Sequence, residues 1–173
     1  MAINQQNAVL VGLSAELKPQ FLEMAADYQS AGENRHDAGV EDFDAYLERL
    51  AMYAAGVNLP AEHVPSSEFY LLGDGKLIGR AGLRHSLNRE LEIIGGHIGY
   101  DVRPSERGKG FGTLILRLAL EKARGINLKK VLLTCDADNA ASARIIEKNG
   151  GRLDKQMIYE KTGKLISRYR IEL

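Results

Sequence analysis

The sequence predicts a single α+β domain over residues 1–173, with a mixed, mostly antiparallel sheet and helices on both of its faces. Three observations predict this class. Short apolar or alternating runs, typical of strands, are interspersed with runs of helical period. Short turns that contain glycine join several of these runs, which favours antiparallel hairpins. A chain of this length can also bury a full core as one domain.

The N-terminal part is expected to hold one strand and two helices. Residues 8–13 form an apolar run without helical period and predict the first strand. Helices are expected over 19–31 and about 41–55, because apolar residues recur there at helical spacing and a glycine ends each run. The residues concerned are Phe21, Ala25, Tyr28 and Gly32 in the first run, and Phe43, Leu47, Leu50, Ala54 and Gly56 in the second.

A hairpin and a long central strand are expected next. Residues 68–72 and 77–85 predict two strands around the turn Gly73-Asp74-Gly75-Lys76, and 91–102 predicts the central strand. Side chains alternate between the two faces of a strand. The second strand is therefore expected to place Leu77, Ala81 and Leu83 on one face and Arg80 and Arg84 on the other.

Two helices and three strands are expected in the remaining part. A helix is predicted over 112–124 and an apolar strand, lying in the middle of the sheet, over 129–135. A second helix is predicted over 139–149 with Asn139 as its N-cap. A hairpin within 151–173 is expected to turn at Thr162-Gly163-Lys164.

A glycine-rich turn stands where the central strand passes into the helix 112–124. The stretch 95–113, GGHIGYDVRPSERGKGFGT, contains three glycines in its last six residues. Glycine lets the backbone approach an anion closely and adopt a positive φ. A helix N-terminus directs free N–H groups and the positive end of its dipole at the same place. Arg103, Arg107 and Lys109 add charge, so the turn predicts a phosphate-binding site.

Two common phosphate-binding motifs do not fit this turn. A P-loop needs Gly-x-x-x-x-Gly-Lys-Ser/Thr, which no window supplies. The dinucleotide pattern Gly-x-Gly-x-x-Gly fails because Thr113 stands at its third glycine. The pattern that fits is Arg-x-x-Gly-x-Gly at Arg107, Gly110 and Gly112. It resembles the acyl-CoA pyrophosphate loop of the GNAT superfamily of N-acetyltransferases.

The following elements are similar to the same family. A strand-like run KKVLLTC leads to the helix start Asn139-x-x-Ser142, and the helix ends in Lys148-Asn149-Gly150. The stretch 95–112 looks in particular like a subgroup of predicted bacterial acetyltransferases. The polar loop 33–39 lies where GNAT proteins cover the acceptor pocket, which makes Glu33, His36 and Asp37 candidates for substrate contact.

The resemblance implies an acyl-CoA-dependent N-acyltransferase. Acetyl-CoA would be the acyl-donor co-substrate, no metal would be needed, and a small-molecule or peptide amine would attack the thioester directly. The pantetheine arm would pair with the open edge of the central strand, in the manner of an added strand. The cofactor-binding residues implied are Tyr100, Asp101, Val102, Arg107, Gly108, Lys109, Gly110, Phe111, Gly112, Thr113, Asn139 and Ser142.

The catalytic positions of the family are altered in this chain. The resemblance places a Glu or His base eleven or nine residues before the loop arginine, where this chain has Gly96 and Ile98. His97 lies between them and is the first candidate for the base, since its ordinary pKa suits proton transfer. Alternation along the strand turns it to the other face, so a structural role or a donor in the substrate pocket is the alternative. Glu92 is the second. The family's Tyr acid falls on Ile146, so water is the alternative proton donor.

Two other functions remain open. The chain could be an acyl-CoA-binding regulatory module without catalysis, because of Gly96 and Ile146. It could also be a nucleotide-binding protein that uses the same turn, with Asp136 or Asp138 accepting from a ribose hydroxyl.

Charge is divided along the chain although the net charge is zero. Residues 1–100 carry 7 basic and 14 acidic side chains, and 101–173 carry 16 and 9. A basic half suits a polyphosphate ligand and an acidic half a cationic acceptor, although solvated helix faces explain the same counts. Nucleic acid is not an expected partner, since Trp is absent and no basic stripe has interleaved aromatics.

The setting expected for this chain is the cytoplasm. No apolar run is long enough to span a membrane, and the first residues do not show the basic segment followed by an apolar run that is typical of a secretory leader. A homodimer is compatible with the resemblance. The single cysteine, Cys135, excludes an internal disulfide and is interpreted as a small core residue rather than a nucleophile.

Overall fold

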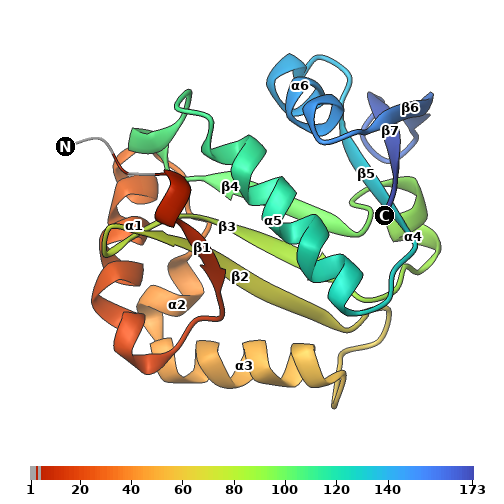
Figure 1. Ribbon diagram of the computed structural model, residues 1–173. Coiled ribbons are helices and arrows are strands. Elements are labelled where there is room, and N and C mark those ends of the chain that lie inside the picture. Colours follow the sequence, from red (N-terminus) through yellow and green to blue (C-terminus); the bar gives the residue numbers. More distant parts are fainter. Residues whose placement is uncertain (1–2, 4) are drawn as a thin grey trace.

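Two antiparallel sheets lie next to each other in the computed structural model, which describes residue 3 and residues 5–173 (Figure 1). The first sheet has the order β1-β2-β3-β4 and the second the order β5-β7-β6. The strands of the first sheet are β1 (Val9–Val11), β2 (Ser66–Gly73), β3 (Lys76–Arg84) and β4 (Ile98–Val102). Those of the second are β5 (Lys130–Asp136), β6 (Arg152–Tyr159) and β7 (Lys164–Glu172).

Helices cover both faces of the first sheet (Figure 1). The N-terminal helices α1 (Lys18–Ser30), α2 (Asp37–Glu41) and α3 (Phe43–Ala55) lie on one face. On the other face α5 (Phe111–Gly125) crosses β1 to β4, and α6 (Ala140–Lys148) packs beside β5. None of the described helices is long and apolar enough to cross a membrane. The predicted α+β class with helices on both faces is confirmed.

Two buried clusters correspond to the two faces. The larger one joins the sheets to α5 through Ile115, Leu116 and Leu133. The smaller one packs α1 and α3 on β2 and β3 through Phe21, Tyr28 and Tyr70. Helix α3 begins at an N-cap, Asp42, whose carboxylate accepts from Ala45 N–H, and ends at Gly56 with φ 68°. The two predicted N-terminal helices are therefore confirmed to within two residues at each end.

The predicted central strand, 91–102, is wrong before Ile98, which is more than half of its length. Residues Arg89–Ile93 form a short helix, α4, and the strand begins only at Ile98. Asn88 caps this helix by accepting from Leu91 N–H at 2.9 Å. Gly95 and Gly96 then adopt φ of 102° and 62°, which strand residues do not. The cap and the glycines outweigh the apolar alternation of residues 91–98.

Two further predictions are wrong, one because of strand register and the other because of strand order. A shift between Leu71 and Leu72 places Leu77 in the α1/α3 cluster, whereas Ala81 and Leu83 belong to the α5 cluster. The strand predicted to lie mid-sheet, residues 129–135, is β5, an edge strand of the second sheet. Within the polar loop expected over 33–39, residues from Asp37 on begin α2.

His36, expected in a substrate-contacting loop, is instead buried in the α1/α3 cluster with 3% of its surface exposed. Its ring contacts those of Phe21 and Tyr28. Among the described residues, neither of its ring nitrogens has a hydrogen-bond partner. Burial lowers the pKa of His36 to about 4, against the opposing influence of Asp101.

Acid is therefore expected to destabilise the fold through His36. A histidine whose folded-state pKa lies below its unfolded value contributes stability above about pH 6.5, and this stability is lost as the pH falls toward 4. We expect the free energy of unfolding, measured in urea, to fall by roughly 3 kcal/mol over this range because of His36. His36→Leu should flatten the curve. An equally steep curve in the variant would contradict the assignment.

Candidate active site

A cleft opens between the edge strands β4 and β5. The strands are joined at one end, where His97 N–H donates to Leu132 O at 2.7 Å and Leu132 N–H donates to His97 Nδ1 at 3.0 Å. Beyond this point neither strand pairs with the other. The cleft holds about 280 Å³ and is lined by Ile98, Gly99 and Tyr100 of β4, by Thr134, Cys135 and Asp136 of β5, and by Arg84, Ile94, Gly95, Ser142 and Ile166.

The backbone of β4 offers hydrogen bonds to this cleft. His97 O accepts from Arg84 N–H and Arg103 N–H donates to Ile78 O, so the odd-numbered positions face β3. In an antiparallel pair the groups alternate. Hence the N–H and C=O groups of Ile98 and Tyr100 point away from β3, toward the cleft. An extended ligand with amide groups could add to this edge as a further strand.

The glycine-rich turn stands at the end of the same strand. Gly108 and Gly110 have φ of 77° and 86°, and Gly110 is the N-cap of α5. Successive turn residues with such φ values direct backbone N–H groups into one concavity that suits an anion. Gly112 serves packing, because a Cβ there would lie 2.7 Å from Ile145 Cδ1 of α6. The predicted phosphate cradle therefore has a backbone suited to that role.

The three basic residues near the turn differ in their availability. Arg103 is buried and donates to Asp27 at 2.7 Å, which fastens the end of β4 to α1. Arg107 is exposed and pairs with Glu33 at 2.7 Å, which helps to lower the pKa of that carboxyl to about 2. Lys109 is exposed and pairs with Glu106. Only Arg107 and Lys109 lie where a soluble anion could reach them.

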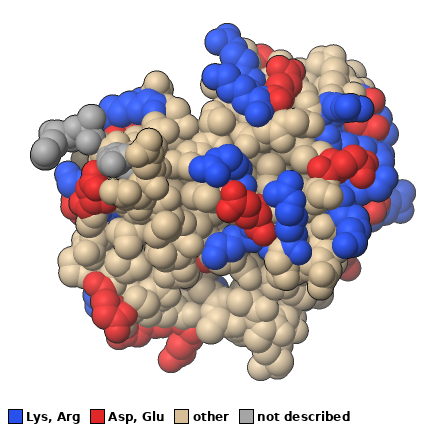
Figure 2. Space-filling view, viewed as in Figure 1, with Lys and Arg blue, Asp and Glu red and all other residues tan. Residues whose placement is uncertain are grey.

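The charge division of the sequence is visible on the surface. Figure 2 shows Lys and Arg gathered over the side of α5, α6 and the second sheet, and acidic side chains at the lower left, over the N-terminal helices.

Of the other residues implied as cofactor contacts, two line the cleft, and the rest are engaged in contacts within the protein. Ser142 Oγ lies 3.0 Å from Tyr100 Oη, and both residues line the cleft. Burial raises the pKa of Tyr100 to about 12, so its hydroxyl is protonated at neutral pH and can donate a proton.

The remaining implied residues serve the fold. Phe111 is buried in the core, and Asn139 caps α6 by accepting from Ser142 N–H. Asp101 turns to the α1 side, and Val102 O accepts from Arg107 Nε. Thr113 N–H donates to Gly110 O within the first turn of α5.

The two candidate bases lie outside the cleft. His97 and Glu92 line a separate hollow with Lys130, Arg168 and Arg170. Nδ1 of His97 is occupied by Leu132 N–H, and burial lowers the pKa of the imidazole. The structure thus brings these two residues together, but neither of them lines the β4–β5 cleft.

Replacing His97 with alanine should cost stability rather than chemistry. The change leaves Leu132 N–H without its acceptor, for a loss of about 1–2 kcal/mol in the free energy of unfolding. We expect the pH dependence of kcat/KM to keep its shape. A base at His97 would give a limb below about pH 6.5, and loss of that limb in His97→Ala, with a drop of roughly 100-fold in rate, would overturn this expectation.

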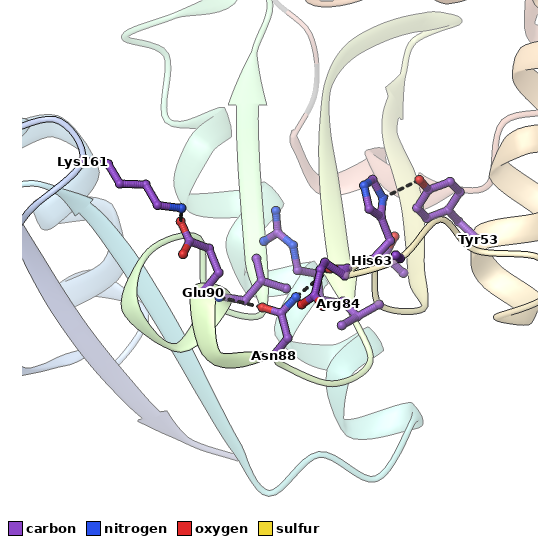
Figure 3. Close-up of a pocket in the computed structure, with 11 residues that line it drawn as sticks. Tyr53, His63, Arg84, Asn88, Glu90 and Lys161 are labelled. Carbon is purple, nitrogen blue, oxygen red and sulfur yellow. Dashed lines mark hydrogen bonds and ion pairs between the residues drawn. The ribbon is translucent and has the colours of Figure 1, made fainter.

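A second, larger pocket opens beside the cleft (Figure 3). It holds roughly 700 Å³ and is bounded by the α3–β2 connection, α4 and the β6–β7 turn. Tyr53 Oη and His63 Nδ1 are hydrogen-bonded on one side, and Glu90 pairs with Lys161 at 2.9 Å on the other. The guanidinium of Arg84 lies between these two pairs in Figure 3.

A buried network of charges lies between the first sheet and α1. Arg80 donates to Glu68 at 2.8 Å and to Asp101 at 2.9 Å, and Asp101 accepts from Tyr28. Burial raises the pKa of Glu68. The carboxylate of Glu68 lies over Gly82, where a Cβ would come within 2.9 Å of it, and Gly82 pairs with Gly99 of the cleft.

Sequence reasoning missed Arg84, Glu90 and Glu68 as site residues. One signal was present, since the alternation had set Arg80 and Arg84 on the face opposite the apolar residues. Within residue 3 and residues 5–173, no group of three or more His, Cys, Asp and Glu side chains is placed to hold a metal ion.

Comparison with protein families matches residues 9–152 to a family described as the acetyltransferase (GNAT) domain. A search of curated proteins gave no significant match. Among solved structures, Mycobacterium smegmatis RimJ in complex with a CoA-disulfide superposes with a TM-score of 0.74 at 15% identity, over 98% of this chain and 84% of that one.

Two further solved structures are similar. The microcin C7 self-immunity acetyltransferase MccE, in complex with acetyl-CoA and AMP, has a TM-score of 0.70 at 12% identity, over 96% of this chain and 92% of that one. RimL, a ribosomal L7/L12 alpha-N-protein acetyltransferase in complex with coenzyme A, has a TM-score of 0.68 at 14% identity, over 95% and 93%. At these identities the likeness establishes the fold.

Proposed function

The chain belongs to the GNAT acetyltransferase family, and from this membership we propose that it transfers the acetyl group of acetyl-CoA to an amine by direct attack. The observation that carries the proposal is the open edge of β4, which faces the β4–β5 cleft and leads to a glycine turn at the start of α5. A strand edge and an anion cradle in one line fit a ligand that has amides at one end and phosphates at the other.

Coenzyme A is proposed to lie along this line. The pyrophosphate would meet the N–H groups of residues 108–112, with Arg107 and Lys109 at the rim. The pantetheine amides would pair with β4, and the thioester would reach Ile98 and Gly99. A backbone N–H of β4 would then polarise the thioester carbonyl, as an oxyanion donor does.

The residues of the cleft supply a proton donor for the leaving thiolate. Tyr100 lines the cleft, is protonated at neutral pH, and is held by Ser142. It therefore replaces the family's Tyr acid, whose position is occupied by the buried Ile146.

The proton of the amine needs a separate acceptor. In the network on the acceptor face, burial raises the pKa of the Glu68 carboxyl, which makes it a better proton acceptor than an ordinary glutamate. We propose Glu68 as that acceptor, through a water, in preference to His97 and Glu92.

The acceptor amine is proposed to enter from the larger pocket of Figure 3. One of the similar proteins is named for acetylating a ribosomal protein, which supports a peptide amine as the acceptor. A small-molecule amine is the other acceptor class proposed. A cytoplasmic location and a homodimer stay predictions.

Calorimetry with coenzyme A, acetyl-CoA and NAD tests the proposal. We expect the first two to bind and NAD not to bind, and a screen of amines with acetyl-CoA to release free thiol. Binding of NAD alone would favour a nucleotide-binding protein. Binding of acetyl-CoA without thiol release from any amine would favour a regulatory module.

A further inference from the structure

Arg84 carries a positive charge that no carboxylate neutralises within ion-pair distance among the described residues. Its Nη1 donates to the carbonyl oxygens of Gly95 at 3.3 Å and Gly96 at 2.9 Å. Burial lowers the pKa of this guanidinium, and the more distant carboxylate of Glu68 opposes the shift without reversing it. A half-buried cation of this kind is costly unless a ligand supplies the negative charge.

Arg80 is an arginine on the same face whose charge is neutralised by carboxylates. It lies four residues earlier on β3, pairs with both Glu68 and Asp101, and has a raised pKa. The two side chains project from the same face of one strand, so their different pairing is specific to the site of Arg84.

Arg84 also stands at a junction. Of the described residues, it alone lines both the β4–β5 cleft and the larger pocket. The reacting amine must come within about 3–3.5 Å of the thioester carbon. An anionic group bound by Arg84 would therefore lie close to that amine.

Two of the remaining charges of the pocket are paired with each other, whereas Glu62, which also lines it, has no ion pair among the described residues. Glu90 accepts from Lys161 at 2.9 Å and also from Tyr159 Oη. Figure 3 shows this pair to one side of the Arg84 guanidinium, with His63 and Tyr53 on the other. At the junction itself, the charged group without an ion pair is the cation of Arg84, which attracts an acid.

We propose that the acceptor is an α-amino acid whose free carboxylate binds Arg84 while its amine meets the thioester. The inference rests on the proposed acetyl transfer. In an α-amino acid the carboxylate carbon is two bonds from the nitrogen, so both groups fit at the junction, and the side chain has the larger pocket. The planar guanidinium suits a carboxylate by two parallel hydrogen bonds.

The reaction balances without another reactant. The neutral amine nitrogen attacks the thioester carbon, a C–N bond forms and the C–S bond breaks. The amine loses one proton and the leaving thiolate gains one, which gives an N-acetyl amino acid and free coenzyme A.

The test compares acids with their amides. Thiol release from acetyl-CoA is measured with the twenty L-amino acids, the α-carboxamide of the best one, spermidine and a tetrapeptide. We expect the acid to exceed its carboxamide in kcat/KM by about 30- to 100-fold, as for a charge-assisted pair. In Arg84→Gln this ratio should fall to about 1 to 3, and in Arg84→Lys to about 10, because a point charge replaces the fork.

The ratio is measured within each variant, so a general loss of activity does not move it. Arg117→Gln, on the exposed face of α5, should leave the ratio as in the parent. A carboxamide, peptide or polyamine that equals the acid, or a ratio unchanged in Arg84→Gln, overturns the inference and leaves acetyl transfer standing. Failure to bind acetyl-CoA at all overturns both.

Discussion

Replacing Gly99 with valine is expected to lower kcat/KM by about 100-fold or more while the protein stays folded. Gly99 is the second residue of β4 and lines the cleft, and no atom lies within 4 Å of the place its Cβ would occupy. Valine suits a strand. Its methyl groups would fill the space assigned to the thioester, where a shift of about 1 Å already costs roughly 100-fold.

Valine substitutions at two other glycines are the controls for this result. Gly125→Val, at the end of α5 and also in open space, should change neither stability nor activity appreciably. Gly96→Val should instead unfold the protein, because its Cβ would collide with Leu132 O and its φ is 62°. Thermal unfolding and steady-state rates distinguish the three. If Gly99→Val turns over like the parent, the thioester does not lie in this cleft.

The sequence predicted the helix ends and the turn before α5, because nearby glycines decide them. The ends of α1 and α3 follow from Gly32 and Gly56, and the turn at the start of α5 follows from its glycines. The short helix α4 was also decided locally, by the Asn88 cap, but the apolar alternation after it favoured a strand.

What the sequence could not predict depends on register and on pairing between distant segments. The shift at Leu71 and Leu72 decides the face of Leu77, and no residue type marks it. The role of His97 depends on Leu132, which comes 35 residues later. Arg80 and Arg84 are both arginines of β3 and lie four residues apart, so alternation places them on the same face. Only the fold shows that Glu68 and Asp101 reach one and not the other.

Gly110→Val is expected to weaken coenzyme A binding by about 100-fold or more. Gly110 has φ 86°, a conformation that a β-branched residue adopts only under strain. Relief of that strain would rotate the peptide groups on either side, and the N–H groups of the turn would no longer converge on the phosphates. Arg107→Ala should cost less, roughly tenfold, because its guanidinium adds one charge-assisted contact and is already shared with Glu33.

Gly163→Val is the matched control for backbone strain. Gly163 has φ 70° and lies in the β6–β7 turn with no atom within 4 Å of its Cβ position, so valine meets the same backbone penalty there. We expect both valine variants to lose a similar free energy of unfolding, about 1–3 kcal/mol, and Gly163→Val to bind coenzyme A like the parent in calorimetry. Equal binding by folded Gly110→Val would place the phosphates elsewhere. A loss of affinity in Gly110→Val alone would assign it to the turn, since the strain is common to both variants.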